Sequence, residues 1–302
     1  MLKKVLTRLI GLLGVRTFLE REIDLLKINQ GLILTKINKT LDAKNIQDYE
    51  FKIFSQWGED GIIQKLVDLI PVQNKTFIEF GVEDFKESNC RFLMMKDNWS
   101  GFVIDGSLKN IKKIKNSHYY WAYELSAHHA FITAENINDL LEVSGFDYDL
   151  GLMSIDIDGV DYYVFDAIQL YKPRILILEY NAVLGLDRAI SVPYDKSFNR
   201  TQLHASNLFF GASLPAMIDL AAKKGYTFIG TNSSGNNAFF LRNDQLRYAE
   251  NIIDVSSSFT ISKFRESRGS EGDLTYLNGG ERLREISGMT VFNTVKKVNE
   301  IL

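Results

Sequence analysis

Thr76-Phe77-Ile78-Glu79-Phe80-Gly81-Val82-Glu83 is a short apolar run that ends in a glycine and two nearby acids. Such a run predicts a buried strand, and Gly81 lets the backbone turn out of the sheet and approach a ligand closely. Further apolar runs follow, alternating with segments of helical period, which is typical of a parallel sheet covered on both faces. Strands are predicted at 76–80, 101–104, 119–123, 151–157 and 174–179, and helices at 88–96, 108–115, 134–142 and 162–170.

The end of the predicted sheet differs from its beginning. After a helix predicted at 208–224, two strand-like runs at 226–230 and 238–242 are separated only by a short Asn, Ser and Gly segment. This spacing predicts a hairpin, because a parallel crossover needs about a dozen residues. We therefore expect an α/β Rossmann-like fold whose seven-stranded sheet is mostly parallel with an antiparallel last strand. The polar tail from Asn243 is assigned only as a cap or an extra loop.

Composition narrows the class of protein. The 302 residues are 45% hydrophobic, enough for a real core, and the 35 basic and 38 acidic residues are mixed along the chain. The net charge of -3 therefore leaves no polycationic face for nucleic acid. Cys90 is the single cysteine, so no internal disulfide can form, and a reducing cytoplasm is expected.

The N-terminal segment is predicted to be an amphipathic helix. Apolar residues recur at helical spacing between Lys3, Lys4 and Arg8, and these charges argue against a membrane span. The apolar residues are Leu2, Val5, Leu6, Leu9, Ile10 and Leu13, and the stripe continues through Leu25, Ile28, Leu32 and Ile37. We expect this stripe to pack on the domain or on a second subunit of a homo-oligomer, while peripheral contact with the inner face of a membrane stays open. Residues 1–50 are read as a helical extension and 51–302 as the catalytic domain.

The first predicted strand ends where a ligand of an open α/β sheet is expected. Gly81 stands alone, so the G-x-G-x-x-G cradle for a pyrophosphate is missing, and a ligand without a pyrophosphate, such as S-adenosylmethionine, fits better. Asp105 ends the second strand and can accept hydrogen bonds from ribose hydroxyls, which would serve NAD equally well. The alternatives are that Asp105 caps the next helix and that Glu79 is a buried carboxylate bonded to loop amides.

Four motifs together carry a family resemblance. They are Ser55-Gln56-Trp57-Gly58-Glu59-Asp60-Gly61-Ile62-Ile63, Phe77-Ile78-Glu79-Phe80-Gly81-Val82-Glu83, Glu87-Ser88-Asn89-Cys90-Arg91-Phe92-Leu93 and Asn236-Asn237-Ala238-Phe239-Phe240. With the strand plan, they resemble FkbM-type and related class I S-adenosylmethionine-dependent methyltransferases of polysaccharide and natural-product pathways, over about residues 53–245. The resemblance implies cofactor contacts at Glu79, Gly81, Asn89, Asp105, Ser107 and Ser126. Glu83 stands where many relatives have a second glycine, which leaves the path of the loop open.

Acidic residues end the fourth and fifth predicted strands. Asp156 and Asp158 point to one side, as do Glu179 and Asn181, because strand side chains alternate. A hydroxyl that receives a methyl group must lose its proton, either to a general base or with help from a divalent cation. The set resembles the metal site of catechol-type and macrolide-sugar O-methyltransferases, and its oxygens suit Mg²⁺ or Mn²⁺.

We therefore predict Asp156, Glu179 and Asn181 as metal ligands. Asp158 either shares the site or acts as the base, and spacing does not tell which aspartate faces the substrate. The alternative is that these acids cap helix starts and bind backbone amides.

Three further groups of residues are candidates. His204 lies in a polar stretch that can close over the acceptor and is a candidate base. His128 and His129 fall near the expected adenine side, while Arg188 and Arg200 can hold a phosphate of the acceptor.

These observations predict an enzyme that methylates a sugar hydroxyl of a nucleotide-linked sugar or a surface or capsular polysaccharide precursor, with catalytic residues Asp158, His204 and Asp156. Two rivals remain. One is an NAD-dependent sugar oxidoreductase or epimerase, which explains Asp105 but neither the missing glycines nor the hairpin. The other is an inactive membrane-associated scaffold that uses the N-terminal helix.

Overall fold

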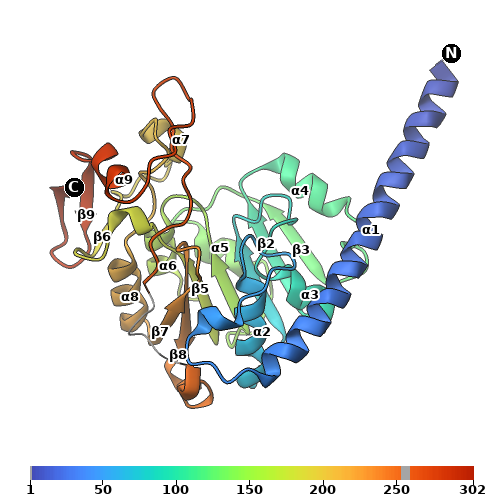
Figure 1. The fold of residues 1–302 in the computed structure, drawn as a ribbon, viewed down its shortest axis with the longest axis horizontal. Coiled ribbons are helices and arrows are strands. Elements are labelled where there is room, and N and C mark those ends of the chain that lie inside the picture. The colour runs from blue at the N-terminus through green and yellow to red at the C-terminus, as the bar shows by residue number, and fades with distance from the viewer. Residues whose placement is uncertain (1, 253–258) are drawn as a thin grey trace.

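The computed structural model describes residues 2–252 and 259–302, and it describes side chains from residue 14 onward with the exception of residue 16. The stripe predicted at Leu2, Val5, Leu6, Leu9, Ile10 and Leu13 therefore lies outside the described side chains. A long helix, α1 (Leu2–Thr40), leads into an α/β body and projects beyond it (Figure 1).

The central sheet has seven strands in the order β3-β2-β1-β4-β5-β8-β7. Strands β1 to β5 pair in parallel, and β8 runs antiparallel to both β5 and β7. The predicted fold class is thus confirmed, including the terminal hairpin. The strands are β1 (Thr76–Phe80), β2 (Ser100–Asp105), β3 (Leu125–His129), β4 (Leu152–Ile155), β5 (Ile175–Glu179), β7 (Tyr226–Thr231) and β8 (Asn237–Arg242).

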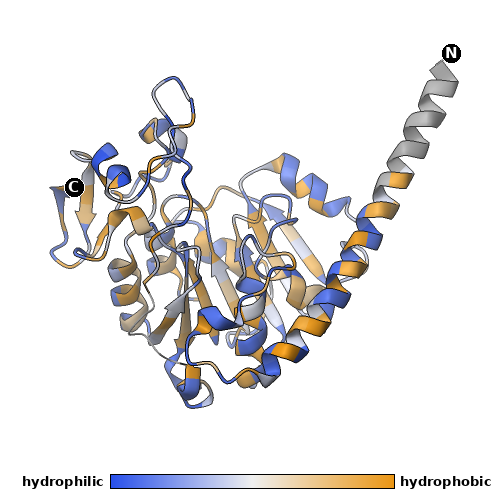
Figure 2. Ribbon diagram, viewed as in Figure 1, coloured by the Kyte–Doolittle hydropathy of each residue, from blue (hydrophilic) through white to orange (hydrophobic). Residues whose placement is uncertain are grey.

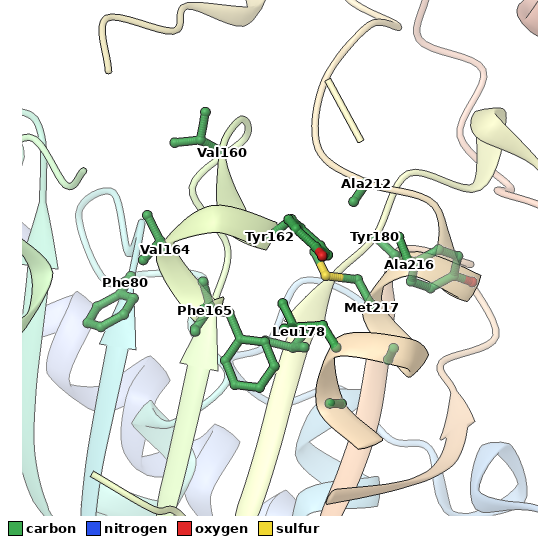
Figure 3. Packing of buried hydrophobic residues seen from close by; sticks show 14 of the residues in the cluster. Phe80, Val160, Tyr162, Val164, Phe165, Leu178, Tyr180, Ala212, Ala216 and Met217 are labelled. Carbon is green, nitrogen blue, oxygen red and sulfur yellow. The ribbon is translucent and has the colours of Figure 1, made fainter. Parts of the chain in front are cut away.

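Helices cover both faces of this sheet, because side chains alternate along each strand. In β1, Phe77 packs with the core on one face and Ile78 with the core on the other. The first face is covered by α2 (Glu59–Leu69), α3 (Arg91–Asp97) and α4 (Leu108–Lys115), and the second by α5 (Ile137–Glu142), α6 (Asp161–Ala167) and α8 (Leu214–Lys223). Figure 3 shows part of the second core, where residues of α6 and α8 gather over the end of β5.

Two predicted elements were misplaced. The third strand lies at 125–129 and not at 119–123, where the chain makes turns. The aromatic residues of 119–123 suggested a strand, but Tyr119 is buried beside the Phe85 ring and the Arg91 guanidinium instead. The helix predicted from residue 208 begins at Leu214, where the Ser213 hydroxyl accepts a hydrogen bond from the Ala216 N–H and caps the first turn.

The C-terminal tail is more than a loop. Its strands β9 (Thr290–Asn293) and β10 (Val298–Ile301) form a second sheet with β6 (Ile190–Ser191), in the order β10-β9-β6. With the short helices α7 (Arg200–Leu203) and α9 (Gly280–Glu285), they lie at the end of the molecule farthest from the start of α1 (Figure 1). The 3-10 helices are η1 (Ile46–Tyr49), η2 (Ala182–Leu184), η3 (Asn243–Tyr248) and η4 (Glu250–Ile252).

The second half of α1 packs on the body through a face different from the predicted stripe. Of that stripe only Ile28 contacts the core around Phe51 and Phe92, while Leu25, Leu32 and Ile37 are exposed. The sequence pattern was misleading because the buried face is polar or small, with Asp24, Gly31, Thr35 and Asn38 facing inward. Within the described residues, no helix is long and apolar enough to cross a bilayer.

The Ser55–Asp60 motif forms a polar brace. One oxygen of the buried Asp60 carboxylate accepts the backbone N–H groups of Ile53, Phe54 and Ser55, each at 2.7 Å. Burial nevertheless raises the pKa of Asp60 to about 6, since these bonds only partly offset desolvation.

The neighbouring Glu59 carboxylate accepts the side-chain amides of Asn232 and Asn237 at 2.6 and 3.0 Å. Two motifs that lie far apart in the sequence are therefore hydrogen-bonded to each other, and they join the start of α2 to the β7–β8 hairpin.

We predict that Asp60→Asn changes how stability depends on pH. The folded carboxyl, with its pKa raised to about 6, keeps a proton that the unfolded chain releases near 3.8. Its contribution is therefore fully present at acid pH and is lost as pH rises through 6. The amide can accept the same backbone bonds without a charge to desolvate. The free energy of unfolding of the wild type, measured by urea titration relative to the variant, should fall by about 2 kcal/mol between about pH 4.5 and about pH 7.5.

The surface variant Asp139→Asn serves as the control and should run parallel to the wild type. Parallel curves for Asp60→Asn and the wild type would contradict this account of Asp60.

Candidate functional site

Two connected cavities open at the carboxyl ends of β1, β4 and β5. The larger has a volume of about 400 Å³ and the smaller about 270 Å³. Gly81, Glu83, Asp156 and Asp158 line both, so the cavities adjoin at these residues and form one crevice; we call this shared wall the junction. This is the place where ligands bind in open α/β sheets.

The loop after β1 forms this junction by crossing the end of β4. Gly81 has φ +68°, and a Cβ atom on it would lie 1.6 Å from the carbonyl oxygen of Asp156. Only glycine can make this approach. Glu83, at the position where the family resemblance led us to expect a second glycine, also adopts a left-handed conformation with φ +48°. The loop therefore keeps a glycine-like path there in spite of the side chain.

Glu79 organises the start of α3. Its carboxylate accepts the Ser88 hydroxyl at 2.6 Å, the Asn89 N–H at 2.7 Å and the Cys90 N–H at 3.2 Å. Burial raises the pKa of Glu79 to about 6. The side chain also lines the larger cavity, so it matches the bonded carboxylate foreseen as an alternative and still borders the predicted cofactor site.

Asp105 and Ser107 lie in the smaller cavity. Asp105 accepts the backbone N–H of Glu83 at 2.8 Å and that of Ser107 at 2.7 Å, while the Ser107 hydroxyl caps α4. The cap that the sequence analysis considered for Asp105 is thus made by Ser107, while Asp105 holds the β1 and β2 exit loops together. The remaining walls are largely apolar and include Ala130, Phe131, Ile132, Ile157, Val160 and Phe198. A cavity with one polar end and apolar walls suits a nucleoside.

Of the other two predicted cofactor contacts, Asn89 lies at the crevice and Ser126 does not. Asn89 lines the larger cavity and donates its amide to the Ser154 hydroxyl at 3.0 Å. Ser126 does not reach either cavity: it is exposed near the start of β3, paired with Phe102. The family resemblance implied this contact, but Ser126 lies away from the residues that line the two cavities.

Three carboxylates meet at the crevice. Asp156, Asp158 and Glu179 each offer an oxygen, and these atoms lie within 4.8 Å of one another. Burial and then the charge of Asp158 raise the pKa of Asp156, and burial and then Asp156 raise that of Glu179, both well above the ordinary range. Oε2 of Glu179 is buried and accepts no hydrogen bond within the described part of the chain. Three converging acids with one unsatisfied oxygen fit a hard divalent cation.

Asn181 does not complete this set. Its side-chain oxygen accepts the Val183 N–H at 3.0 Å, and its amide donates to the carbonyls of Leu208 and Phe210, both at 2.9 Å. All its polar atoms therefore bond to backbone, and we do not count it in the carboxylate cluster, although it borders the larger cavity. Asp158, for which the sequence left open a role as metal ligand or as base, is the third member of the carboxylate cluster with Asp156 and Glu179.

His204 is not in the crevice. It ends α7 and its Nδ1 accepts the Ser206 N–H at 3.2 Å, and it lines neither cavity. The polar stretch around it places Arg200 at the site instead. The sequence could not distinguish these two residues because it does not show which side of a four-residue helix faces inward.

Of the remaining candidates, only Arg200 lines a cavity. His128 of β3 packs against the ring of Phe102 in the neighbouring strand β2, and His129 is hydrogen-bonded to the Gly106 carbonyl at 3.1 Å. Arg188 pairs with Glu300 at 3.1 Å and borders neither cavity. Arg200 lines the larger cavity and forms an ion pair with Asp158.

The sequence analysis missed one wall of the larger cavity. Ser262, Phe264, Glu266 and Arg282 all come from the C-terminal tail. The Phe264 ring packs edge-on against Trp57 at 4.4 Å, and the Phe264 carbonyl accepts the Arg282 guanidinium at 2.9 Å. No periodicity or motif marked these residues, because the tail reaches the site only through its tertiary path.

Comparison with known proteins finds similar folds among solved structures but no matching family. No family model matches the chain, and no curated protein matches it. Among solved structures, an O-methyltransferase from Bacillus cereus in complex with SAH is 12% identical, with a TM-score of 0.39 over 71% of this chain and 89% of that one. The CurJ carbon methyltransferase is 11% identical, with a TM-score of 0.41 over 66% of this chain and 57% of that one. These neighbours are methyltransferases, but likenesses this distant decide neither the reaction nor the substrate of this chain.

We predict that Gly81→Ala is far more damaging than a matched change elsewhere. Gly145 has a similar φ of +65° but open space where a Cβ would stand. Gly145→Ala should therefore cost about 1–2 kcal/mol, the penalty of the left-handed conformation alone. Gly81→Ala adds a clash with backbone and should lower the free energy of unfolding in urea by about 2 kcal/mol more. Equal losses would show that the crossing of β1 and β4 is looser than described.

Proposed function

We propose that this protein is an S-adenosylmethionine-dependent O-methyltransferase that acts on a hydroxyl of a sugar-like acceptor. The observation that carries the proposal is the two-part crevice, with a nucleoside-sized cavity on one side of Gly81 and a carboxylate-lined cavity on the other. Residues 51–302 would form the catalytic domain and residues 1–50 its helical extension.

The cofactor would lie across the junction. Its adenosine fits the smaller cavity, where the Asp105 carboxylate can accept from the ribose hydroxyls and Phe131 and Ile132 offer apolar contact. Its methionine end would continue past Gly81 toward Glu79 and Asn89. The sulfonium would then lie near the acids that line both cavities, and their negative charge favours binding of a cation.

The acceptor would occupy the larger cavity. As the hydroxyl oxygen bonds to the methyl carbon, the carbon–sulfur bond breaks with its electron pair left on sulfur, and the hydroxyl proton must leave. With His204 outside the crevice, an aspartate is the nearest acceptor for that proton. Asp156 and Asp158 are both placed for this role.

The carboxylate cluster also fits a divalent ion. Asp156, Asp158 and Glu179 would hold Mg²⁺ or Mn²⁺, which supplies charge that lowers the pKa of a bound hydroxyl. The protein would also help to orient the acceptor. Asn181 donates its amide to the Leu208 and Phe210 carbonyls, and it thereby fixes the wall of the cavity that Phe210 lines.

Cofactor binding tests the proposal first. Isothermal titration of the full chain should show binding of S-adenosylhomocysteine and none of NAD. The reverse result would support an oxidoreductase and refute the proposal. Methyl transfer from labelled S-adenosylmethionine to a panel of sugar nucleotides should follow, and the absence of transfer across a broad panel would favour the scaffold alternative.

We predict that excess EDTA abolishes turnover and that Asp156→Asn lowers the rate at least about tenfold. Asp166→Asn, an exposed aspartate on α6, is the matched control and should leave the rate unchanged. Full activity in EDTA would remove the ion from the mechanism, whereas loss in Asp156→Asn alone would leave this residue as the base.

A further inference from the structure

Arg282 is a buried cation whose nearby charges do not neutralise it. It belongs to α9, is only 7% exposed and lines the larger cavity. Its one described hydrogen bond is to the Phe264 carbonyl, and its Nε is buried without a partner. Among residues 2–252 and 259–302, no carboxylate forms an ion pair with it. Buried charges are normally paired, so this guanidinium lacks the counter-ion that its burial calls for within the described part of the chain.

A second guanidinium lies in the same cavity, and it is already paired with Asp158. Arg200 lines the same cavity, where its side chain stacks on the Phe210 ring at 3.9 Å and donates to the Asn207 carbonyl at 2.7 Å. Burial lowers the pKa of Arg282, the charge of Arg200 lowers it further, and Glu266 raises it less. Glu266 itself is paired with Arg268 at 3.1 Å. Among the described residues, Arg282 is therefore the cation on the tail side that has no ion pair, whereas the sheet side carries the carboxylate cluster.

We infer that the acceptor carries an oxyanion, a phosphate or a carboxylate, that binds Arg282 with Arg200 beside it. This inference rests on the proposed function and specifies its substrate class. A planar guanidinium matches the geometry of both groups, and a buried one binds them more strongly than an exposed one. The oxyanion would supply the missing counter-ion, while the acceptor hydroxyl lies toward Asp156 and Glu179 on the opposite wall.

Titration with small anions tests the inference without knowledge of the acceptor. Inorganic pyrophosphate, inorganic phosphate and acetate would be titrated into the full chain saturated with S-adenosylhomocysteine. We predict saturable binding of at least one anion, weakened at least about tenfold in Arg282→Gln and partly restored in Arg282→Lys, which keeps the charge. The ranking of the phosphates against acetate distinguishes a phosphorylated acceptor from a carboxylated one.

Arg188→Gln is the matched control, since Arg188 is an ion-paired arginine outside both cavities, and it should bind the anions as the wild type does. Three results would overturn the inference: no anion binding to the wild type, equal binding to Arg282→Gln, or weaker binding of S-adenosylhomocysteine itself in that variant. The last would mean that Arg282 holds the cofactor's own carboxylate. If S-adenosylhomocysteine fails to bind at all, the proposed function fails, and the same titrations without it still test the anion site.

An independent observation concerns the outward face of α1. Opposite the buried residues Asp24, Gly31 and Thr35, a row of large apolar side chains is at least half exposed. The row consists of Leu19, Ile23, Leu26, Ile33 and Ile37. Figure 2 shows hydrophobic residues recurring along α1. Nothing within the described chain covers this row.

The row follows the heptad spacing of a coiled coil. Its members are four, three, seven and four residues apart, with Gln30 at the core position between Leu26 and Ile33. The sequence continues the same register upstream at Leu2, Val5, Leu9 and Leu12, with Arg16 as its other polar position. A repeat sustained over more than three heptads is typical of paired helices.

We propose that a second copy of this chain pairs with α1 along this row in a parallel coiled coil. Five half-exposed side chains from each copy would bury on the order of 1,000 Å², near the minimum for a specific interface, before the upstream heptads contribute. Parallel pairing places Gln30 opposite Gln30, where the two amides can bond to each other. Because each body packs on the opposite side of its own α1, the two bodies would lie on the outside of the pair.

Sedimentation equilibrium of the full chain should give the mass of a dimer, and Leu26→Glu together with Ile33→Glu should give a monomer. Leu25→Glu is the matched control, because this leucine is similarly exposed but lies off the row, and it should remain a dimer. A monomeric wild type would overturn the proposal. So would a wild type that gathers on vesicles of phosphatidylglycerol and phosphatidylcholine and is monomeric without them, which would identify a membrane as the occupant.

Discussion

The site depends on one close approach, that of the Gly81 backbone to the Asp156 carbonyl. Parallel pairing brings the ends of β1 and β4 side by side, and the two exit loops must cross in the space that a single Cβ would fill. This crossing divides the crevice into its two cavities and holds Asp156 beside Glu179. Glu79 and Asp105 then stabilise the crossing, because Glu79 accepts amides of the segment after β1, and Asp105 accepts one amide from the β1 exit loop and one from the β2 exit loop. The same acids therefore both build and border the candidate cofactor site.

The motifs that carry the family resemblance mostly stabilise this framework. Asp60 gathers three backbone amides, and Glu59 joins the start of α2 to Asn232 and Asn237 in the hairpin loop. These are buried polar groups with specific partners, and leaving any of them unpaired would cost free energy. These motifs therefore build the framework around the crevice, and most of their polar groups are taken up by contacts within the fold.

Charged side chains of opposite sign line different walls of the larger cavity. The sheet contributes carboxylates at the ends of β4 and β5, while Arg200 and Arg282 approach from α7 and α9. A cationic cofactor and a divalent ion suit the first wall, and an oxyanion suits the second. Under the proposed function, the reaction would then depend on the ends of the sheet strands, and the choice of substrate on α7 and the C-terminal tail.

The sequence by itself determined the sheet, its terminal hairpin and the acids at the ends of β1, β2, β4 and β5, because apolar period and strand ends are local properties. It misplaced β3, since a run of aromatic residues such as 119–123 packs equally well in a turn. It could not tell that Asn181 is used up by backbone groups or that His204 turns away from the cavity, because hydrogen-bond partners far along the chain are not written in local spacing. Only the tertiary structure brought Phe264 and Arg282 from the tail to the crevice and showed which face of α1 is left exposed. Those features depend on contacts between segments that are distant in sequence, and such contacts are decided by packing of the whole chain.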